Sequence, residues 1–313
     1  MKGRILAITF LVLSFGLHSQ LWIKRSDLGG LARHRATGMS IGNKGYIGIG
    51  HFNGTGTNII LNDWWQFDPA TNSWTQKADF QGNSGIGNYG VAPLGMDNQG
   101  YIVGGAFANQ EAWKYVPMTN SWQQIQDLPS GLSDRVGFTI NNIGYVVIGN
   151  DLWALNPTTD TWELKNIVPF SNSIWKASFD IDGKGYLQNG SEIWEYKPSI
   201  DSWISRAAFP GLATAGSGGF SQHGKGYIVA GYGGGLSNVN KEFWRFDPKT
   251  NSWHQLDNFP GTSRRFSVAF SIGERSYFGT GTNGTNFKDF WEFSSILETF
   301  DFESNVRVQV YPN

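Results

Sequence analysis

The chain has 313 residues, no cysteine and a formal net charge of −1. Its 24 Lys and Arg residues do not outnumber its 25 Asp and Glu residues, so it lacks the basic field that nucleic-acid binding needs. Without cysteine it cannot form a disulfide, a thiolate metal site or a cysteine nucleophile. Aromatic residues make up 15% and glycines number 41, which favours an all-β protein with short strands and tight turns.

Residues 1–20 have the features of a signal peptide. Lys2 and Arg4 supply the positive start, and residues 5–15 form an apolar run too short to span a bilayer as a helix. We expect cleavage near Ser19 or Gln20; the alternative is a buried first strand or helix. No second long apolar run follows. We therefore expect a secreted or cell-surface protein without a transmembrane segment, with the periplasm as the alternative location.

From residue 46 onward one pattern occurs six times. Each copy has a Tyr, a glycine four residues later, and then an acidic residue two residues before a Trp. The Tyr residues are Tyr46, Tyr101, Tyr145, Tyr186, Tyr227 and Tyr277, and the glycines are Gly50, Gly105, Gly149, Gly190, Gly231 and Gly281. The acidic residues and their Trp partners are Asp63/Trp65, Glu111/Trp113, Asp151/Trp153, Glu192/Trp194, Glu242/Trp244 and Asp289/Trp291. A second Trp follows nine residues later in the first five copies, at Trp74, Trp122, Trp162, Trp203 and Trp253.

The sixth copy lacks its second Trp, and Trp22 at the other end of the chain supplies a match. Trp22 precedes Tyr46 by 24 residues, the same interval that separates Trp and Tyr in most later copies. We therefore predict that the N-terminal strand completes the sixth unit. A ring closed in this way has no open strand edge where the chain ends meet.

Each unit is predicted to contain four antiparallel strands, which we call a, b, c and d in chain order. Strand a covers residues such as 35–41, b contains the Gly-Tyr pair, c the first Trp and d the second. Aromatic residues alternate along strand c with the period of two that strands impose. Asp68 and Pro69 open a c–d hairpin turn, as do Asp247 and Pro248. The glycine after strand b is expected where a side chain would clash.

These units resemble those of the kelch family over residues 21–293. The family's paired glycine is complete only at Gly104 and Gly105, and Ile148, Asn189 and Ala230 replace the first glycine elsewhere. The resemblance implies an all-β, six-bladed kelch-type β-propeller with four antiparallel strands per blade.

Loop lengths indicate which face of such a propeller carries function. The interval from Tyr to first Trp is 19, 12, 8, 8, 17 and 14 residues, whereas the c–d turn is constant. The variable b–c loops share a face with the d–a loops, because strands alternate in direction. Loops on a rigid scaffold commonly build binding sites, so we expect the ligand on this face.

Three arginines near the start of strand a are expected at the channel mouth: Arg35, Arg135 and Arg265. Tyr89 and Trp175 take the corresponding position in units two and four. Such a cluster suits a carboxylated sugar, held by guanidinium groups and by stacking on aromatic rings. The alternative is that the arginines hydrogen-bond loop carbonyl groups.

The long first b–c loop adds His51 and Asn53, which could bind sugar hydroxyl groups or stand in solvated turns. Three motif matches are set aside. Residues 38–42 match a nucleophile elbow but fall in strand a, and residues 85–90 match a dinucleotide motif but precede a strand. Residues 180–183 lack the remaining ligands of a calcium loop.

Two functions remain open. The first is a binding or scaffold module for a protein or glycan ligand. The second is a carbohydrate-active enzyme, such as an epimerase or mutarotase of acidic sugars, which needs a carboxylate or His within reach of the arginines. We expect no catalytic residue, no metal and no cofactor; the kelch-type copper oxidases depend on a cysteine that is absent here.

Residues 294–313 form a tail outside the repeats. Their last nine residues, ending in Tyr311, Pro312 and Asn313, resemble the start of the type IX secretion sorting domain of Bacteroidetes. The resemblance implies a truncated sorting domain and an outer-membrane export machinery as partner. The alternative is an ordinary exposed strand.

Overall fold

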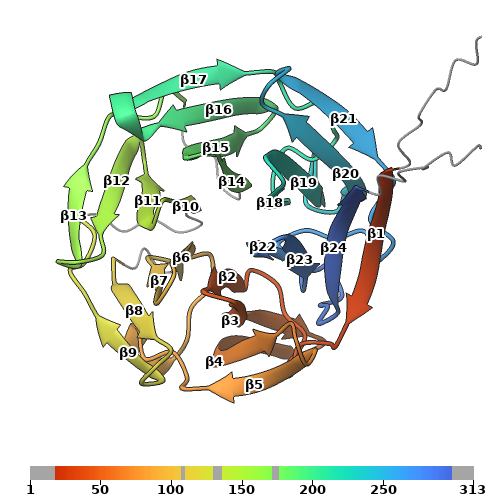
Figure 1. The fold of residues 1–313 in the computed structure, drawn as a ribbon. Coiled ribbons are helices and arrows are strands. Elements are labelled where there is room, and N and C mark those ends of the chain that lie inside the picture. The colour runs from red at the N-terminus through yellow and green to blue at the C-terminus, as the bar shows by residue number, and fades with distance from the viewer. Residues whose placement is uncertain (1–17, 107–109, 130–135, 171–175, 298–313) are drawn as a thin grey trace, which may run out of the picture.

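The computed structural model describes residues 18–106, 110–129, 136–170 and 176–297. In these residues the chain forms six four-stranded antiparallel sheets arranged as blades around a central axis (Figure 1). No α-helix occurs in these segments, and two single-turn 3₁₀ helices, η1 (Asn83–Gly85) and η3 (Pro198–Ile200), lie in connections. The predicted all-β, six-bladed propeller is confirmed.

Blades one to five use four consecutive strands in chain order from the axis outward, and blade six uses β22 to β24 with β1 as its outermost strand. The strands of blades one to three are β2 (Thr37–Ile41), β3 (Lys44–Gly54), β4 (Thr57–Asp68) and β5 (Ser73–Lys77); β6 (Ala92–Gly95), β7 (Gly100–Val103), β8 (Ala112–Val116) and β9 (Ser121–Gln124); β10 (Val136–Ile140), β11 (Ile143–Ile148), β12 (Asp151–Asn156) and β13 (Thr161–Leu164). Those of blades four to six are β14 (Ser178–Ile181), β15 (Lys184–Asn189), β16 (Glu192–Lys197) and β17 (Ser202–Arg206); β18 (Gly218–Gln222), β19 (Lys225–Tyr232), β20 (Val239–Asp247) and β21 (Ser252–Leu256); β22 (Val268–Ile272), β23 (Arg275–Gly279), β24 (Phe290–Leu297) and β1 (His18–Arg25).

The N-terminal strand closes the ring, as predicted. Strand β1 pairs antiparallel with β24, with Trp22 opposite Phe293. The Trp22 ring lies 5.2 Å from those of Phe243 and Phe259, and thus packs against blade five as well. An ion pair of 2.9 Å between Arg25 and Glu292 adds a polar contact to this joint. The two ends of the chain are therefore joined by backbone pairing and aromatic packing.

The predicted signal peptide and tail fall mainly on residues 1–17 and 298–313, which lie outside the described residues. The described strands reach further than the repeat boundaries of 21 and 293. Strand β1 begins at His18 and β24 ends at Leu297.

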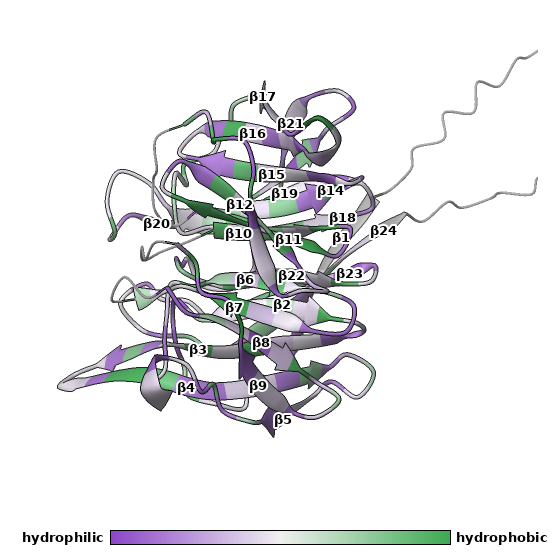
Figure 2. Cartoon of the chain, turned by 90° about the vertical axis from the view of Figure 1, so that its left-hand side faces the viewer, coloured by the Kyte–Doolittle hydropathy of each residue, from purple (hydrophilic) through white to green (hydrophobic). Residues whose placement is uncertain are grey.

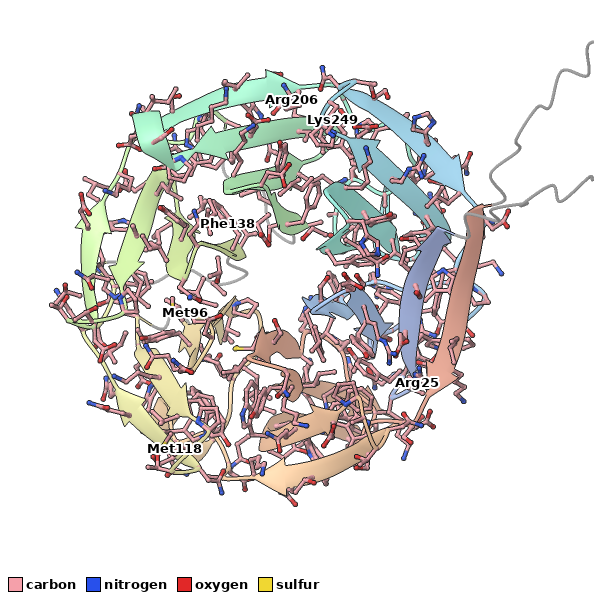
Figure 3. All side chains as sticks on the ribbon, in the orientation of Figure 1. Arg25, Met96, Met118, Phe138, Arg206 and Lys249 are labelled. Carbon is pink, nitrogen blue, oxygen red and sulfur yellow. The ribbon has the colours of Figure 1, made fainter. Side chains whose placement is uncertain are left out.

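Hydrophobic side chains fill the spaces between neighbouring blades. In blades three, four and five an inner-strand Phe stacks on the repeated Tyr of strand b, with ring centroids 5.1 to 5.5 Å apart. Figure 3 shows Phe138 among these side chains near the axis. Most of the Tyr hydroxyl groups reach polar partners, as when Tyr186 donates to Glu195 at 2.7 Å. The repeated Tyr is thus a core residue with one hydrogen-bonded end.

The repeated Trp of strand d ties adjacent blades together. In four of the six blades its indole N–H donates to a backbone carbonyl just beyond strand d of the preceding blade, whereas the N–H groups of Trp22 and Trp203 find no partner in the described chain. The pairs are Trp74 with Ser26, Trp122 with Ala78, Trp162 with Gln126 and Trp253 with Ala207. The nine-residue spacing in the sequence therefore sets an inter-blade contact as well as a hairpin.

The two faces of the ring differ in their connections. Strands β3 and β4 continue into a hairpin that projects from the b–c face, while the start of β1 and the end of β24 lie toward the opposite face (Figure 2). The three motif matches fall where predicted. Residues 38–41 belong to β2, residues 86–90 precede β6, and residues 182–183 form the turn between β14 and β15.

Candidate functional site

A central cavity of about 290 Å³ runs between the inner strands of all six blades. Alternate residues of these strands point into the core between blades, and the others face the cavity. The cavity-facing residues are mostly glycine, alanine, serine and threonine. Small side chains therefore keep the axis open, and larger polar groups gather at its ends.

At the b–c end of the cavity, two arginines flank one phenyl ring. The guanidinium carbon of Arg35 lies 4.6 Å from the centroid of Phe266, and that of Arg265 lies 5.3 Å from it. The backbone N–H of Arg35 donates to the carbonyl of Phe266 at 3.0 Å, which joins the loops that enter blades one and six. Arg35 and Phe266 both adopt the left-handed backbone region, with φ of 53° and 59°.

Positive charge dominates the described part of this mouth. Burial lowers the pKa of Arg265, and the nearby charge of Arg35 lowers it further. Among the described residues no carboxylate pairs with Arg265, and its Nε atom is buried without a hydrogen-bond partner. Lys176 lines the same cavity, and burial lowers its pKa to about 8. The mouth is thus suited to an anionic group.

Two histidines lie beside the arginines. His34 and His51 face each other in an antiparallel bridge, with ring centroids 5.0 Å apart, and His51 stacks on Tyr89 at 5.1 Å. The Nε2 atom of His34 is 3.1 Å from Oδ1 of Asn53. Burial and the charge of Arg35 lower the pKa of His34 to about 4, so this ring is neutral at pH 7.

The tautomer of His34 follows from its partner. Its Nε2 atom lies against Oδ1 of Asn53, as Nε2 of His51 does against Asn58. Because an amide oxygen accepts and the His34 ring is neutral, its Nε2 carries the hydrogen and its Nδ1 carries a lone pair. The Nδ1 atoms of both rings are buried without a hydrogen-bond partner in the described chain. The mouth therefore combines cations with the neutral acceptor of His34.

The structure places five of the seven predicted site residues around one sector of the mouth. These are Arg35, Tyr89, Arg265, His51 and Asn53, contributed by blades one, two and six. Arg35 and Tyr89 are close, with 5.8 Å between the guanidinium carbon and the ring centroid. The other two predicted residues, Arg135 and Trp175, lie outside the described residues.

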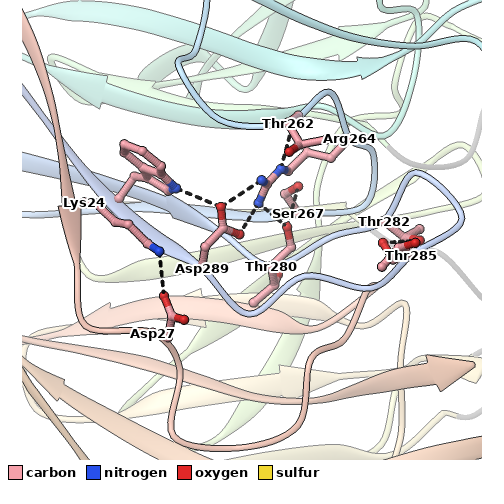
Figure 4. Close-up of polar contacts among 10 residues, drawn as sticks. Lys24, Asp27, Thr262, Arg264, Ser267, Thr280, Thr282, Thr285 and Asp289 are labelled. Atoms are coloured by element: carbon pink, nitrogen blue, oxygen red, sulfur yellow. Dashed lines mark hydrogen bonds and ion pairs between the residues drawn. The ribbon is translucent and has the colours of Figure 1, made fainter. Parts of the chain in front are cut away.

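Sequence reasoning missed the role of two neighbouring arginines. Arg33 and Arg264 are fully buried, and each makes a two-point ion pair, with Asp63 and Asp289 respectively. The Arg264 pair has N–O distances of 2.5 and 2.8 Å (Figure 4). The acidic residues of the repeat were the available clue, because a buried carboxylate needs a partner.

These arginines also hold irregular backbone. Arg33 donates to the carbonyl of Ile49 at 3.0 Å, and Arg264 donates to that of Thr280 at 3.1 Å. Ile49 and Thr280 have φ of 46° and 58°, a region that β-branched residues rarely adopt. Arg33 and Arg264 thus bind carbonyl groups of the loops that present Arg35 and Arg265.

The repeated acidic residues of most blades accept hydrogen bonds. In five blades the carboxylate accepts from the indole N–H of the Trp two residues later. The pairs are Asp63–Trp65, Glu111–Trp113, Glu192–Trp194, Glu242–Trp244 and Asp289–Trp291. In blades two and five the longer Glu also accepts from a backbone N–H of the preceding d–a loop, at Asn83 and Leu212.

Comparison with known proteins agrees with the architecture. A family model described as the Kelch motif matches residues 215–260, which contain all four strands of blade five. The chain is similar to the solved structure of YjhT, with a TM-score of 0.70 and 16% identity over 86% of this chain and 97% of that chain. At this identity the likeness concerns the fold alone. No curated protein matches the sequence.

The class that these observations define is a β-propeller of six blades. More particularly, the repeats, the motif match and the structural neighbour support a kelch-repeat propeller, a scaffold of the kind used for binding. No helix in the described residues is long and apolar enough to cross a bilayer. Nor do those residues hold a cluster of three or more His, Cys, Asp or Glu suited to a metal ion.

Proposed function

We propose that this protein is an exported binding module that takes an acid-bearing ligand, on a glycan or a protein, at the b–c mouth of its central cavity. The observation that carries the proposal is Arg265. Arg265 is a partly buried cation that has no carboxylate partner of its own in the described chain. It lies beside the same phenyl ring as a second cation, Arg35. Holding two like charges together is unfavourable, and an incoming anion offsets that cost.

The groups around the arginines favour a carboxylated sugar among such ligands. Guanidinium groups bind carboxylates through paired hydrogen bonds, and Phe266 and Tyr89 offer faces on which a sugar ring can stack. The neutral ring of His34 lies in the same sector. The loops that present these groups are anchored by buried ion pairs, which favours a preformed site.

A glycan array with the purified protein tests the proposal, using Arg265→Gln as the variant. We expect binding to sugars that carry a carboxylate, and a loss of roughly tenfold or more in affinity in the variant, because a charge-assisted hydrogen bond is removed. Lys249→Gln is the matched control, since Lys249 lies in a c–d turn on the opposite face. Equal binding by the wild type and Arg265→Gln would contradict the proposal.

The enzymatic alternative is favoured by one observation, the His34–His51 pair beside Arg35. An epimerase or mutarotase of acidic sugars needs a group that moves a proton next to the bound carboxylate. NMR exchange spectroscopy of uronic acid anomers with and without the protein distinguishes the two functions. Accelerated exchange that is lost in His51→Asn would establish the enzyme, whereas binding without acceleration supports the module.

Export is the second part of the proposal and rests on residues 1–20 and 294–313. The strands next to these segments begin and end on the face opposite the mouth, so an attachment at either end leaves the mouth accessible. Fractionation of cells that express the chain with and without residues 1–20 tests export. Retention of both forms in the cytoplasm would contradict it.

A further inference from the structure

The far part of the cavity contains a charged group that the proposed function does not use. Asp180 lies on β14, the inner strand of blade four, and its carboxylate faces the cavity. The same position on the other inner strands carries only small or hydroxyl residues: Ser40, Gly95, Thr139, Ser221 and Ser271. Asp180 is therefore the acidic residue among the described residues that line this cavity.

No described residue neutralises Asp180. It makes no ion pair or side-chain hydrogen bond in the described chain. The strands packed against β14 are β10, β15, β18 and β19. Gly185 lies opposite Asp180 in the sheet, and Thr139 and Ser221 take its position on the neighbouring inner strands. The lysines that begin β15 and β19, Lys184 and Lys225, form ion pairs with Glu195 and Asp247. Thr139, Ser221 and Gly185 carry no charge. Asp180 is exposed to the cavity, but the surrounding blades remove part of its hydration and raise its pKa to about 6. At neutral pH a lone carboxylate thus faces the cavity.

The opposite charge stands at the other end of the same cavity. Arg35 and Lys176 line its b–c end. Lys176 lies two residues before β14, and Asp180 follows it by four residues along the chain. At a strand rise of 3.3 Å per residue, their backbones are separated by at most about 13 Å. The long side chain of Lys176 can shorten the distance between the two charges. The cavity is thus cationic at its mouth and anionic within.

We infer that the cavity accepts a dipolar ligand, whose ammonium group reaches Asp180 while its acid group is held at the mouth. This inference rests on the proposed function for the acid end only. The hydroxyl groups of Thr139 and Ser221 can accept further hydrogen bonds from an ammonium group. Ligands of this class are amino acids with a terminal amine, and amino sugars that carry a carboxylate.

An inorganic cation is also positively charged and is the other ligand that a lone carboxylate could attract. A single carboxylate with hydroxyl neighbours offers fewer charged ligands than calcium sites usually have. An ammonium group instead needs one carboxylate and a few acceptors. The test therefore includes calcium as a separate arm.

The experiment measures the affinity of four probes by ligand-detected NMR at pH 7.5: 6-aminohexanoate, hexanoate, hexylamine and calcium chloride. Each probe is titrated into the wild type, Asp180→Asn and Arg265→Gln. We expect the wild type to bind 6-aminohexanoate roughly tenfold more tightly than hexanoate, and Asp180→Asn to abolish this difference. Hexylamine binding should fall in Asp180→Asn and persist in Arg265→Gln.

The two hypotheses fail in different ways. Equal affinity of 6-aminohexanoate and hexanoate for the wild type, or no change in hexylamine binding in Asp180→Asn, would overturn the ammonium site. So would tight calcium binding that displaces hexylamine. Hexanoate binding that is unchanged in Arg265→Gln would overturn the acid site at the mouth and leave the ammonium site standing.

Two further measurements guard against a folding artefact. Asp180→Asn should keep or raise the midpoint of denaturant unfolding at pH 7.5, because the raised pKa means that ionisation of Asp180 opposes folding. Amine binding by the wild type should weaken as the pH falls below 6, where the carboxylate takes up a proton. A pH-independent preference for the amine probe would contradict the role of Asp180.

Discussion

Blades one and six differ from blades three and four although all four derive from the same repeat. In blades three and four the glycine after strand b, Gly149 or Gly190, turns directly into strand c, with open space around the position of an added Cβ. In blades one and six the glycine has a larger φ of 104° or 95° and lies against the backbone of the loop that enters its own blade. The same sequence position therefore forms a turn in blades three and four and a close contact with a loop in blades one and six.

The loop contact in blades one and six comes with a buried ion pair and strained backbone. Arg33 and Arg264 bind both an aspartate and the carbonyl of a left-handed residue, and the next arginine along each loop faces the mouth. Blades three and four have short b–c turns and no ion pair of this kind in their described residues. In blades one and six, which have longer b–c loops than blades three and four, the additional ion pairs therefore hold the loops that carry the candidate site.

The largest expected effect is the loss of the buried ion pair in blade six. Arg264→Met should lower the free energy of unfolding by about 3–5 kcal/mol, because it leaves Asp289 buried without its cation. Denaturant unfolding measures the change. Glu192→Gln in blade four is the matched control, since Glu192 is exposed, and we expect about 0.5 kcal/mol or less. Similar losses in both variants would remove the distinction between the blades.

A smaller effect is expected at the repeated glycine. Gly281→Ala should cost about 3 kcal/mol, because a Cβ there would lie 2.3 Å from Oγ of Ser267 and 2.8 Å from the carbonyl oxygen of Arg265. Gly190→Ala should cost only about 1 kcal/mol, since it meets no atom within 4 Å and only the left-handed φ is unfavourable. Thermal unfolding of both variants compares the two kinds of blade. A larger loss at Gly190 would reverse the comparison.

The ion pair should also give blade six a pH signature. Burial alone would raise the pKa of Asp289, but the hydrogen bonds and charge of Arg264 outweigh it, and the pKa lies below its ordinary value. The stability from ionised Asp289 is thus present above about pH 4 and is lost as the pH falls through the depressed pKa. Asp289→Asn should cost about 2 kcal/mol at pH 7, and its difference from the wild type should shrink toward pH 2. A difference that stays constant with pH would contradict this account.

The smallest expected effect separates two adjacent arginines. Arg265→Gln should change the free energy of unfolding by about 0.5 kcal/mol or less, because it removes a cation next to Arg35 and breaks no ion pair of the described chain. The substitution Arg264→Met at the neighbouring position should lower the free energy of unfolding several times more in the same denaturation measurement. A large loss of stability in Arg265→Gln would indicate that this residue is structural and would weaken the proposed binding role.

Much of the architecture was accessible from the sequence because each repeated residue answers a local need. The Tyr, glycine and Trp positions predicted the strands, the number of blades and the closure by Trp22. The predicted crowding at the glycine is correct at Gly50, Gly105, Gly231 and Gly281 but wrong at Gly149 and Gly190, where the space is open. The difference arises because short b–c turns bring no loop against strand b.

The candidate site was only partly predictable. The sequence placed Arg35 and Arg265 at the mouth, yet it did not distinguish them from Arg33 and Arg264, one or two residues away. Burial and pairing decide that difference, and both depend on carboxylates 25 and 30 residues further along the chain. The meeting of His34 with His51 likewise follows from a bridge between a loop and strand β3.

The sequence by itself determined the ring, because a short periodic pattern of aromatic residues and glycines specifies one blade and its repetition specifies the rest. Only the tertiary structure decided which polar groups share a cavity. Asp180 lies in an a-strand that looks ordinary in the sequence, and closure of the six blades places it in the same cavity as Arg35 and Lys176. Charges that are distant along a chain become one site only when the fold encloses them in a common space.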